Sequence, residues 1–122
     1  MKKSWKLAVG AAVLLAMPAA ALAHAYPASE TPLPNAVLKS LPAEAAITFT
    51  ETVNRHFSGI TVEGPHGRHV SLGKAILASN DPKTLIVHLR RSTRSGHYTV
   101  FWHALASDGH RTHGKYSFDI RP

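Results

Sequence analysis

The sequence of 122 residues contains no cysteine, which excludes disulfide bonds and every cysteine-ligated metal centre. It is also poor in negative charge, with seven acidic residues against fourteen lysines and arginines. Long apolar runs are missing as well, because residues 7–21 are interrupted by Gly10 and Pro18 and fall short of the roughly 20 residues that a membrane span needs. The fold must therefore be held by an apolar core alone.

The amino-terminal segment has the three parts of a secretory signal peptide. Three lysines among the first six residues precede the apolar run, and the small-residue pattern Ala21-Leu22-Ala23 follows it. We therefore expect cleavage after Ala23 and no retained membrane anchor. This assigns residues 1–23 to a signal peptide and residues 24–122 to a single exported, periplasmic domain, because about 100 residues suffice for one small domain.

Positive charge is clustered only in the segment Arg90-Arg91-Ser92-Thr93-Arg94. Nucleic-acid-binding segments interleave basic with aromatic residues, and no aromatic residue accompanies this cluster. We favour a solvated turn between two strands over a nucleic-acid site, and we expect no nucleic-acid partner.

Short runs of alternating apolar residues, bounded by glycine, proline, asparagine and aspartate, are typical of strands and tight turns. Tyr98, Val100 and Trp102, for example, share one face of an extended chain, so this strand should bury one side. The proline-rich start should lie extended along a sheet edge, and residues 75–78 fit either a helical turn or a short strand. The pattern predicts an all-β, antiparallel, immunoglobulin-like sandwich. Strands are expected near residues 46–50, 59–63, 68–72, 84–89, 97–104 and 115–120.

Although cysteine is missing, histidine is abundant, with nine in the chain and all of them after residue 23. Such enrichment is a hint of metal binding. If cleavage follows Ala23, His24 carries a free α-amine and an imidazole, and these two nitrogens can close a chelate ring around one ion. Groups of both kinds lose their competing protons near neutral pH at modest cost. A nitrogen-rich, tetragonal ligand set of this kind suits Cu(II).

A second ligand pair is predicted in Ser107-Asp108-Gly109-His110, near the other end of the chain. The carboxylate and the imidazole point the same way if the backbone is extended, and Gly109 lets the loop bend. Together with His24, Asp108 and His110 would supply three nitrogens and one oxygen to one ion. Taken alone, Asp108-Gly109 fits a plain tight turn better than a metal site. The conjunction with a histidine at the expected cleavage site favours the metal site.

The chain resembles the periplasmic copper resistance protein C (CopC) family over essentially all of residues 24–122. This resemblance implies a Greek-key β-sandwich or barrel that is immunoglobulin-like or cupredoxin-like. The segments that carry it are His24-Ala25 with the proline-rich start, Ile47-Thr48-Phe49-Thr50-Glu51-Thr52-Val53, Gly96-His97-Tyr98-Thr99-Val100-Phe101-Trp102, and Ser107-Asp108-Gly109-His110 leading to Gly114 and Phe118.

The resemblance also implies a Cu(II) site whose ligands correspond to His24, Asp108 and His110. Glu51 matches the family's glutamate after the second strand, a weak ligand or an outer partner, although a solvated surface carboxylate is an equal alternative. Some members carry a further, methionine-rich Cu(I) site. The two methionines of this chain lie inside the expected signal peptide, so the resemblance implies a member that binds Cu(II) only.

The remaining histidines are mostly expected to be exposed polar residues. His103, on the strand before the expected metal loop, could approach the ion. His113, just after that loop, could take an outer position or hold a second ion. The pair His66 and His69 could bind a weak extra ion. Plain surface positions are expected for His56, His88 and His97.

These features predict a protein that captures Cu(II) outside the cytoplasm without enzymatic turnover. It would buffer the copper ion or deliver it, and the resemblance implies an inner-membrane copper transporter of the CopD type as recipient. The alternative from another class is a copper-dependent oxidative enzyme with an amino-terminal histidine, but Asp108 would then occupy a position that oxygen needs. A third interpretation is a metal-independent, immunoglobulin-like interaction domain.

Overall fold

The computed structural model describes residues 24–122, and the predicted signal peptide therefore lies outside the described residues. Within this range no helix has the length and apolar character needed to cross a bilayer. The elements in chain order are β1 (Pro27–Thr31), β2 (Val37–Leu38), β3 (Glu44–Phe49), β4 (Gly59–Glu63), the short 3₁₀ turn η2 (Pro65–Gly67), β5 (Ser71–Ala78), β6 (Asp81–Leu89), β7 (Gly96–Leu105) and β8 (Arg111–Ile120).

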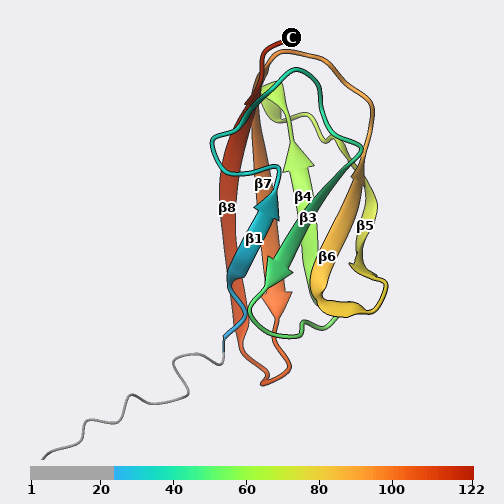
Figure 1. The fold of residues 1–122 in the computed structure, drawn as a ribbon, viewed down its shortest axis with the longest axis vertical. Helices are drawn as coiled ribbons and strands as arrows, with labels where there is room; N and C mark the ends of the chain where they lie inside the picture. Colours follow the sequence, from blue (N-terminus) through green and yellow to red (C-terminus); the bar gives the residue numbers. More distant parts are fainter. Residues whose placement is uncertain (1–23) are drawn as a thin grey trace, which may run out of the picture.

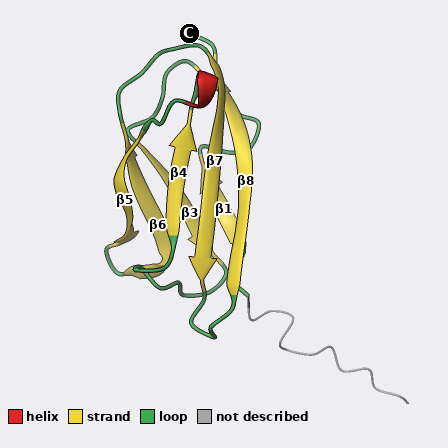
Figure 2. Cartoon of the chain, turned by 180° about the vertical axis from the view of Figure 1, so that it is seen from behind, coloured by secondary structure: helices red, strands yellow, loops and turns green. Residues whose placement is uncertain are grey.

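The strands form two four-stranded sheets that pack face to face (Figure 1, Figure 2). One sheet has the order β1-β3-β6-β5 and the other the order β2-β8-β7-β4. All pairs are antiparallel except β2 with β8, which run parallel. Neighbouring strands are often distant in sequence, as in a Greek key. The predicted all-β sandwich is confirmed.

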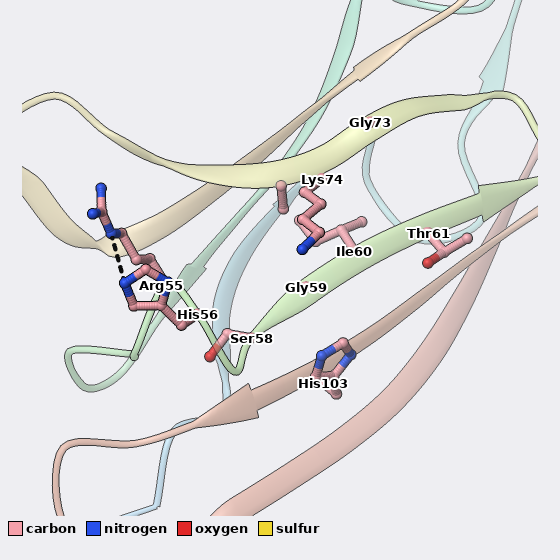
Figure 3. Close-up of a pocket in the computed structure, with 10 residues that line it drawn as sticks. Arg55, His56, Ser58, Gly59, Ile60, Thr61, Gly73, Lys74 and His103 are labelled. Carbon is pink, nitrogen blue, oxygen red and sulfur yellow. Dashed lines mark hydrogen bonds between the residues drawn. The ribbon is translucent and has the colours of Figure 1, made fainter.

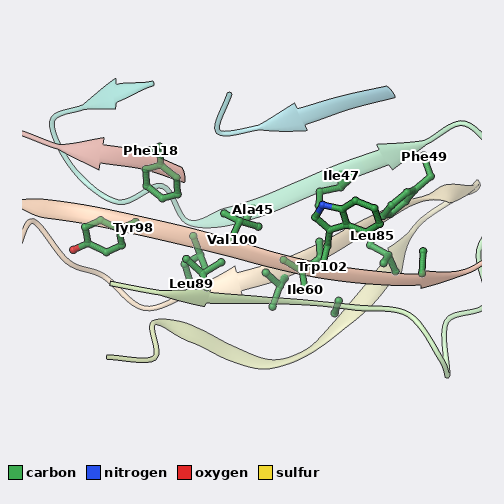
Figure 4. Packing of buried hydrophobic residues seen from close by; sticks show 14 of the residues in the cluster. Ala45, Ile47, Phe49, Ile60, Leu85, Leu89, Tyr98, Val100, Trp102 and Phe118 are labelled. Carbon is green, nitrogen blue, oxygen red and sulfur yellow. The ribbon is translucent and has the colours of Figure 1, made fainter. Parts of the chain in front are cut away.

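The core lies between the two sheets and follows the alternation of side chains along each strand. In β7, Tyr98, Val100 and Trp102 are buried while the residues between them face outward. The Trp102 ring meets the Phe49 ring edge to face at 5.5 Å between centroids, and Tyr98 stacks on Phe118 at 5.4 Å (Figure 4). The first contact joins the two sheets, and the second lies between neighbouring strands of the β2-β8-β7-β4 sheet.

Most predicted strands are observed, with shifted ends. β4 has the predicted bounds, the proline-rich start pairs as edge strand β1, and residues 75–78 belong to a strand. β5 starts later than predicted, at Ser71, because His69 forms only an isolated bridge with Glu63. β6 starts earlier, because the turn lies at Asn80, which has a left-handed φ of 61°. The two-residue strand β2 was not predicted.

The start of β1 and the loop between β7 and β8 lie at the same end of the sandwich (Figure 1). β1 is held there by its pairing with β3, in which Pro27 stands opposite Phe49. The ten-residue strands β7 and β8 pair along their whole length, from Gly96 with Ile120 to Leu105 with Arg111. This long ladder fixes where the loop that joins them is presented.

Candidate metal centre

His24, Asp108 and His110 come together at this end of the sandwich. Each offers one ligand atom, and these atoms all lie within 4.8 Å of one another. The imidazole rings of His24 and His110 have centroids 4.4 Å apart and cross at 72°. Nδ1 of His110 lies 3.1 Å from Oδ2 of Asp108. The structure thus brings together three of the four residues that the sequence analysis selected.

The backbone of residues 24–26 is held by two threonine hydroxyl groups, one from just after the end of β3 and one from β8. Thr50, just after β3, donates to the carbonyl oxygen of His24 at 3.0 Å, and its oxygen accepts the N–H of Tyr26 at 3.1 Å. Thr112, in β8, donates to the carbonyl oxygen of Ala25 at 2.7 Å. The side chain of Ala25 is fully buried between these anchors. The amino-terminal segment is therefore fixed to both sheets at the point where His24 projects.

The loop that carries Asp108 and His110 is a tight turn. Gly109 has a left-handed φ of 89° and donates its N–H to the carbonyl oxygen of Ala106 at 2.9 Å. The N–H of Ala106 in turn donates to the carbonyl oxygen of His110 at 2.9 Å. The tight turn and the convergence of the ligand atoms are therefore compatible. The turn places the side chains of Asp108 and His110 on the side of the loop that faces His24.

Hydrogen bonding keeps Asp108 ionised. The backbone N–H of His110 donates to Oδ1 at 3.0 Å, and this bond is the main reason why the pKa of Asp108 lies below its ordinary value. Partial desolvation opposes the shift, while the side chain of His110 and the charge of His24 lower the pKa further. An ionised carboxylate between two imidazoles is a suitable donor set for Cu(II) or another borderline divalent ion.

Glu51 lies outside this cluster of ligand atoms. It is half-buried in the turn that follows β3, directly after Thr50. Its role as a weak ligand or outer partner stays a prediction. The hydroxyls of Thr50 and Thr112, which hold the backbone beside His24, were not predicted from the sequence. Thr50 stands within a segment that carries the family resemblance, whereas Thr112 has no distinguishing sequence signal.

His103 and His113 are also outside the cluster. They stand directly opposite each other in the β7–β8 ladder and are exposed on the outer face of that sheet. The His103 ring lies over Gly59, where an added Cβ would come within 2.8 Å of it. This ring lines a cavity between β4 and β5 (Figure 3), and none of residues 107–110 belongs to that lining.

His66 lies within η2 and His69 follows it, and Nε2 of His69 is 3.8 Å from Oε2 of Glu63. Within residues 24–122, these side chains do not form a second group of three converging ligands. A weak extra ion at this pair stays a prediction.

Known proteins with a similar sequence or fold cover almost the whole described domain. Protein YobA of Escherichia coli K12 is 36% identical over 99 residues, which are 81% of this chain and 80% of that protein. The crystal structure of CopC from Methylosinus trichosporium OB3b superposes with a TM-score of 0.74 at 25% identity, covering 81% of this chain and 95% of that one.

A second similar structure is that of PcoC, described as a methionine-rich copper resistance protein from Escherichia coli. It has a TM-score of 0.70 and 27% identity, and the match covers 81% of this chain and all of the other. The sequence model of the CopC domain matches residues 28–121. The chain therefore belongs to the CopC domain family.

Proposed function

We propose that this protein binds one Cu(II) ion through His24, Asp108 and His110. The convergence of their ligand atoms within 4.8 Å is the observation that carries the proposal. Two imidazole nitrogens and a carboxylate oxygen suit Cu(II), which stands at the top of the divalent affinity series. The copper resistance named for the related PcoC supports copper as the ion.

Cleavage after Ala23 completes the site in this proposal. The new α-amine of His24 adds a third nitrogen, and the amine and imidazole of one residue chelate the same ion. Binding then needs little rearrangement, since Thr50 and Thr112 already hold the backbone of residues 24–25. The two methionines of the sequence are Met1 and Met17, so the exported domain offers nitrogen and oxygen ligands rather than the thioethers that favour Cu(I).

The proposed role is capture and delivery of copper outside the cytoplasm, in the periplasm. The side chain of His110 is 62% exposed, which lets an acceptor approach the ion and exchange ligands one at a time. A membrane copper transporter of the CopD type is the proposed recipient. Copper is the cargo in this scheme, and no bond is made or broken in any substrate.

The test compares His110→Ala with His97→Ala. His97 is a matched control, because it is an exposed histidine that also contacts an aspartate, with Nδ1 2.7 Å from Oδ1 of Asp119. Cu(II) affinity is measured by competition with a chromogenic chelator on protein that begins at His24. His110→Ala should weaken binding at least about 100-fold, while His97→Ala should change it less than about twofold. Equal losses in both variants would refute the assignment of His110.

The enzymatic alternative is tested separately. The copper-loaded protein with ascorbate should produce hydrogen peroxide no faster than the same concentration of copper held by a simple chelator. Faster production that disappears in His110→Ala would instead establish oxidative chemistry at this site.

A further inference from the structure

Four arginines from two separate segments gather at the opposite end of β7 from the loop that carries Asp108 and His110. Arg90, Arg91 and Arg94 belong to the loop between β6 and β7, and Arg68 follows η2. They line one cavity of about 210 Å³, together with Ser92 and Tyr98. We call this the arginine cavity. The loop between β6 and β7, which carries three of its arginines, lies near the upper end of the molecule in Figure 1, whereas the loop between β7 and β8 lies at the lower end.

The backbone around the arginine cavity is fixed by hydrogen bonds. The N–H of Arg90 donates to the carbonyl oxygen of Val70 at 2.9 Å, and the carbonyl oxygen of Arg68 accepts the N–H of Gly64 at 2.7 Å. The carbonyl oxygen of Ser92 accepts the N–H of Leu41 at 2.9 Å. Arg90, Arg91 and Arg94 are exposed in the loop between two strands, as the sequence predicts, and a second segment that carries the exposed Arg68 is tied to this loop.

A buried polar side chain anchors Arg94. Tyr98 is fully buried, and its hydroxyl donates to the carbonyl oxygen of Arg94 at 2.8 Å while lying 3.5 Å from the hydroxyl of Ser92. Ser92 also accepts the N–H of Arg94 at 3.1 Å. Gly96 lets η2 pack closely here, because an added Cβ would come within 2.5 Å of Pro65. The cavity walls are thus set by the core.

The charge of the arginine cavity is not balanced within the described domain. Its lining includes no carboxylate. None of its four guanidinium groups takes part in an ion pair among residues 24–122. The nearby carboxylate of Glu63 instead approaches His69. Four cations held together without a counter-ion favour the binding of an anion.

We propose that the arginine cavity binds an oxyanion of the phosphate type, either free or as the head group of an anionic phospholipid. Guanidinium groups form paired, charge-assisted hydrogen bonds with phosphate oxygens. The cavity is smaller than the roughly 300–1,000 Å³ of pockets that enclose drug-sized ligands, so it suits a compact ion or head group. This site is independent of the proposed copper centre.

The test is a nuclear magnetic resonance titration of amide-labelled protein with inorganic phosphate at constant ionic strength. Saturable shifts are expected at residues 64–70 and 90–96. The double variant Arg68→Gln, Arg94→Gln should weaken the apparent affinity about tenfold. The matched control Arg55→Gln, Lys83→Gln removes the same charge outside the cavity and should change the affinity less than about twofold.

A second arm uses sedimentation with vesicles of phosphatidylglycerol and phosphatidylcholine. Phosphate binding in the cavity identifies a free ion as a sufficient ligand. Vesicle binding that the first double variant loses and the control retains, without a response to free phosphate, identifies the lipid head group. Shifts scattered over all basic residues, equal losses in the two double variants, or no binding in either arm would overturn the proposal.

Discussion

The hydroxyl of Thr112 donates a 2.7 Å hydrogen bond to the carbonyl oxygen of Ala25, across 87 positions of the chain. This bond ties the residue after His24 to β8, the strand that begins one residue after His110. Thr112→Val keeps the shape of the side chain and removes the donor. We expect an unfolding free energy lower by about 1 kcal/mol and Cu(II) affinity lower by about tenfold.

Chemical denaturation and chelator competition measure these two effects. Thr99→Val is the control, because Thr99 makes a side-chain contact with Ser117 at 3.4 Å in the same β7–β8 ladder, outside the site. A Thr112→Val variant with the Cu(II) affinity of Thr99→Val would show that this anchor does not position His24.

Asp108→Asn tests the carboxylate while conserving the turn, since an amide oxygen can still accept the N–H of His110. We expect Cu(II) affinity to fall about 10- to 100-fold, because a neutral amide offsets none of the metal's charge. Asp119→Asn is the control. The competition titration is repeated at pH 7 and at pH 5.

The direction of the pKa shift predicts how this difference depends on pH. The folded-state pKa of Asp108 lies below the unfolded-state value, because the His110 N–H stabilises the ionised form. The hydrogen bond therefore contributes stability above the unfolded-state pKa, and this contribution is lost as the pH falls through the folded-state pKa. At pH 5 the wild-type carboxylate should remain ionised, and the affinity advantage over Asp108→Asn should persist. Its disappearance between pH 7 and pH 5 would contradict this assignment.

Gly114 is predicted to be needed for core packing at the end of the sandwich that carries His24 and His110. A Cβ at this position would come within 2.7 Å of Cζ2 of Trp102, which is only 8% exposed and has little room to move. At Gly59 a Cβ would meet the exposed ring of His103 at 2.8 Å, and that ring can swing away. Gly114→Ala should therefore lower the unfolding free energy by about 1–3 kcal/mol, and Gly59→Ala by clearly less. Thermal denaturation of the two variants decides between these outcomes, and equal losses would be inconsistent with the packing described.

Tyr116 carries a buried hydroxyl without a hydrogen-bond partner among the described residues. Burial raises the pKa of this phenol, and the negative charge of Glu30 raises it further. Tyr116→Phe should leave stability unchanged or raise it by up to about 1 kcal/mol, because it removes an unsatisfied polar group. Tyr98→Phe should instead lower stability by about 1 kcal/mol, since it deletes the bond to Arg94.

The raised pKa of the Tyr116 hydroxyl also predicts how the stability of the protein changes at alkaline pH. An acid whose pKa is raised by folding costs the folded state stability as the pH rises above the unfolded-state value of roughly 10. Tyr116→Phe should therefore lose less stability than the wild type between pH 9 and pH 11 in urea denaturation. Parallel losses would show that the hydroxyl finds a partner in solution.

Local patterns predicted the strands well because alternation and turn residues act over a few positions. The face shared by Tyr98, Val100 and Trp102 is buried as expected. The pairing of β2 with β8 was not predictable in this way, because two residues are too few to show an alternating pattern and their partner is distant in sequence.

The convergence of His24, Asp108 and His110 was predictable for a different reason. These residues have ligand chemistry at recognisable positions, namely an expected cleavage site and a turn. Thr112 is an ordinary strand residue. Its hydrogen bond could not be predicted, because the acceptor, the carbonyl oxygen of Ala25, is distant in sequence. Arg68 was likewise missed as a neighbour of the 90–94 cluster, because only the packing of η2 brings the two segments together.

The amino-terminal chelate is tested most directly by a Cu(II) titration followed by electron paramagnetic resonance. Protein that begins at His24 is compared with the same chain carrying one additional amino-terminal residue, which blocks the α-amine of His24 and leaves every side chain in place. We predict that the first form binds one ion tightly in a tetragonal, nitrogen-rich site and that the second loses this signal and this affinity. Identical spectra and affinities for the two forms would contradict the role of the amino-terminal histidine.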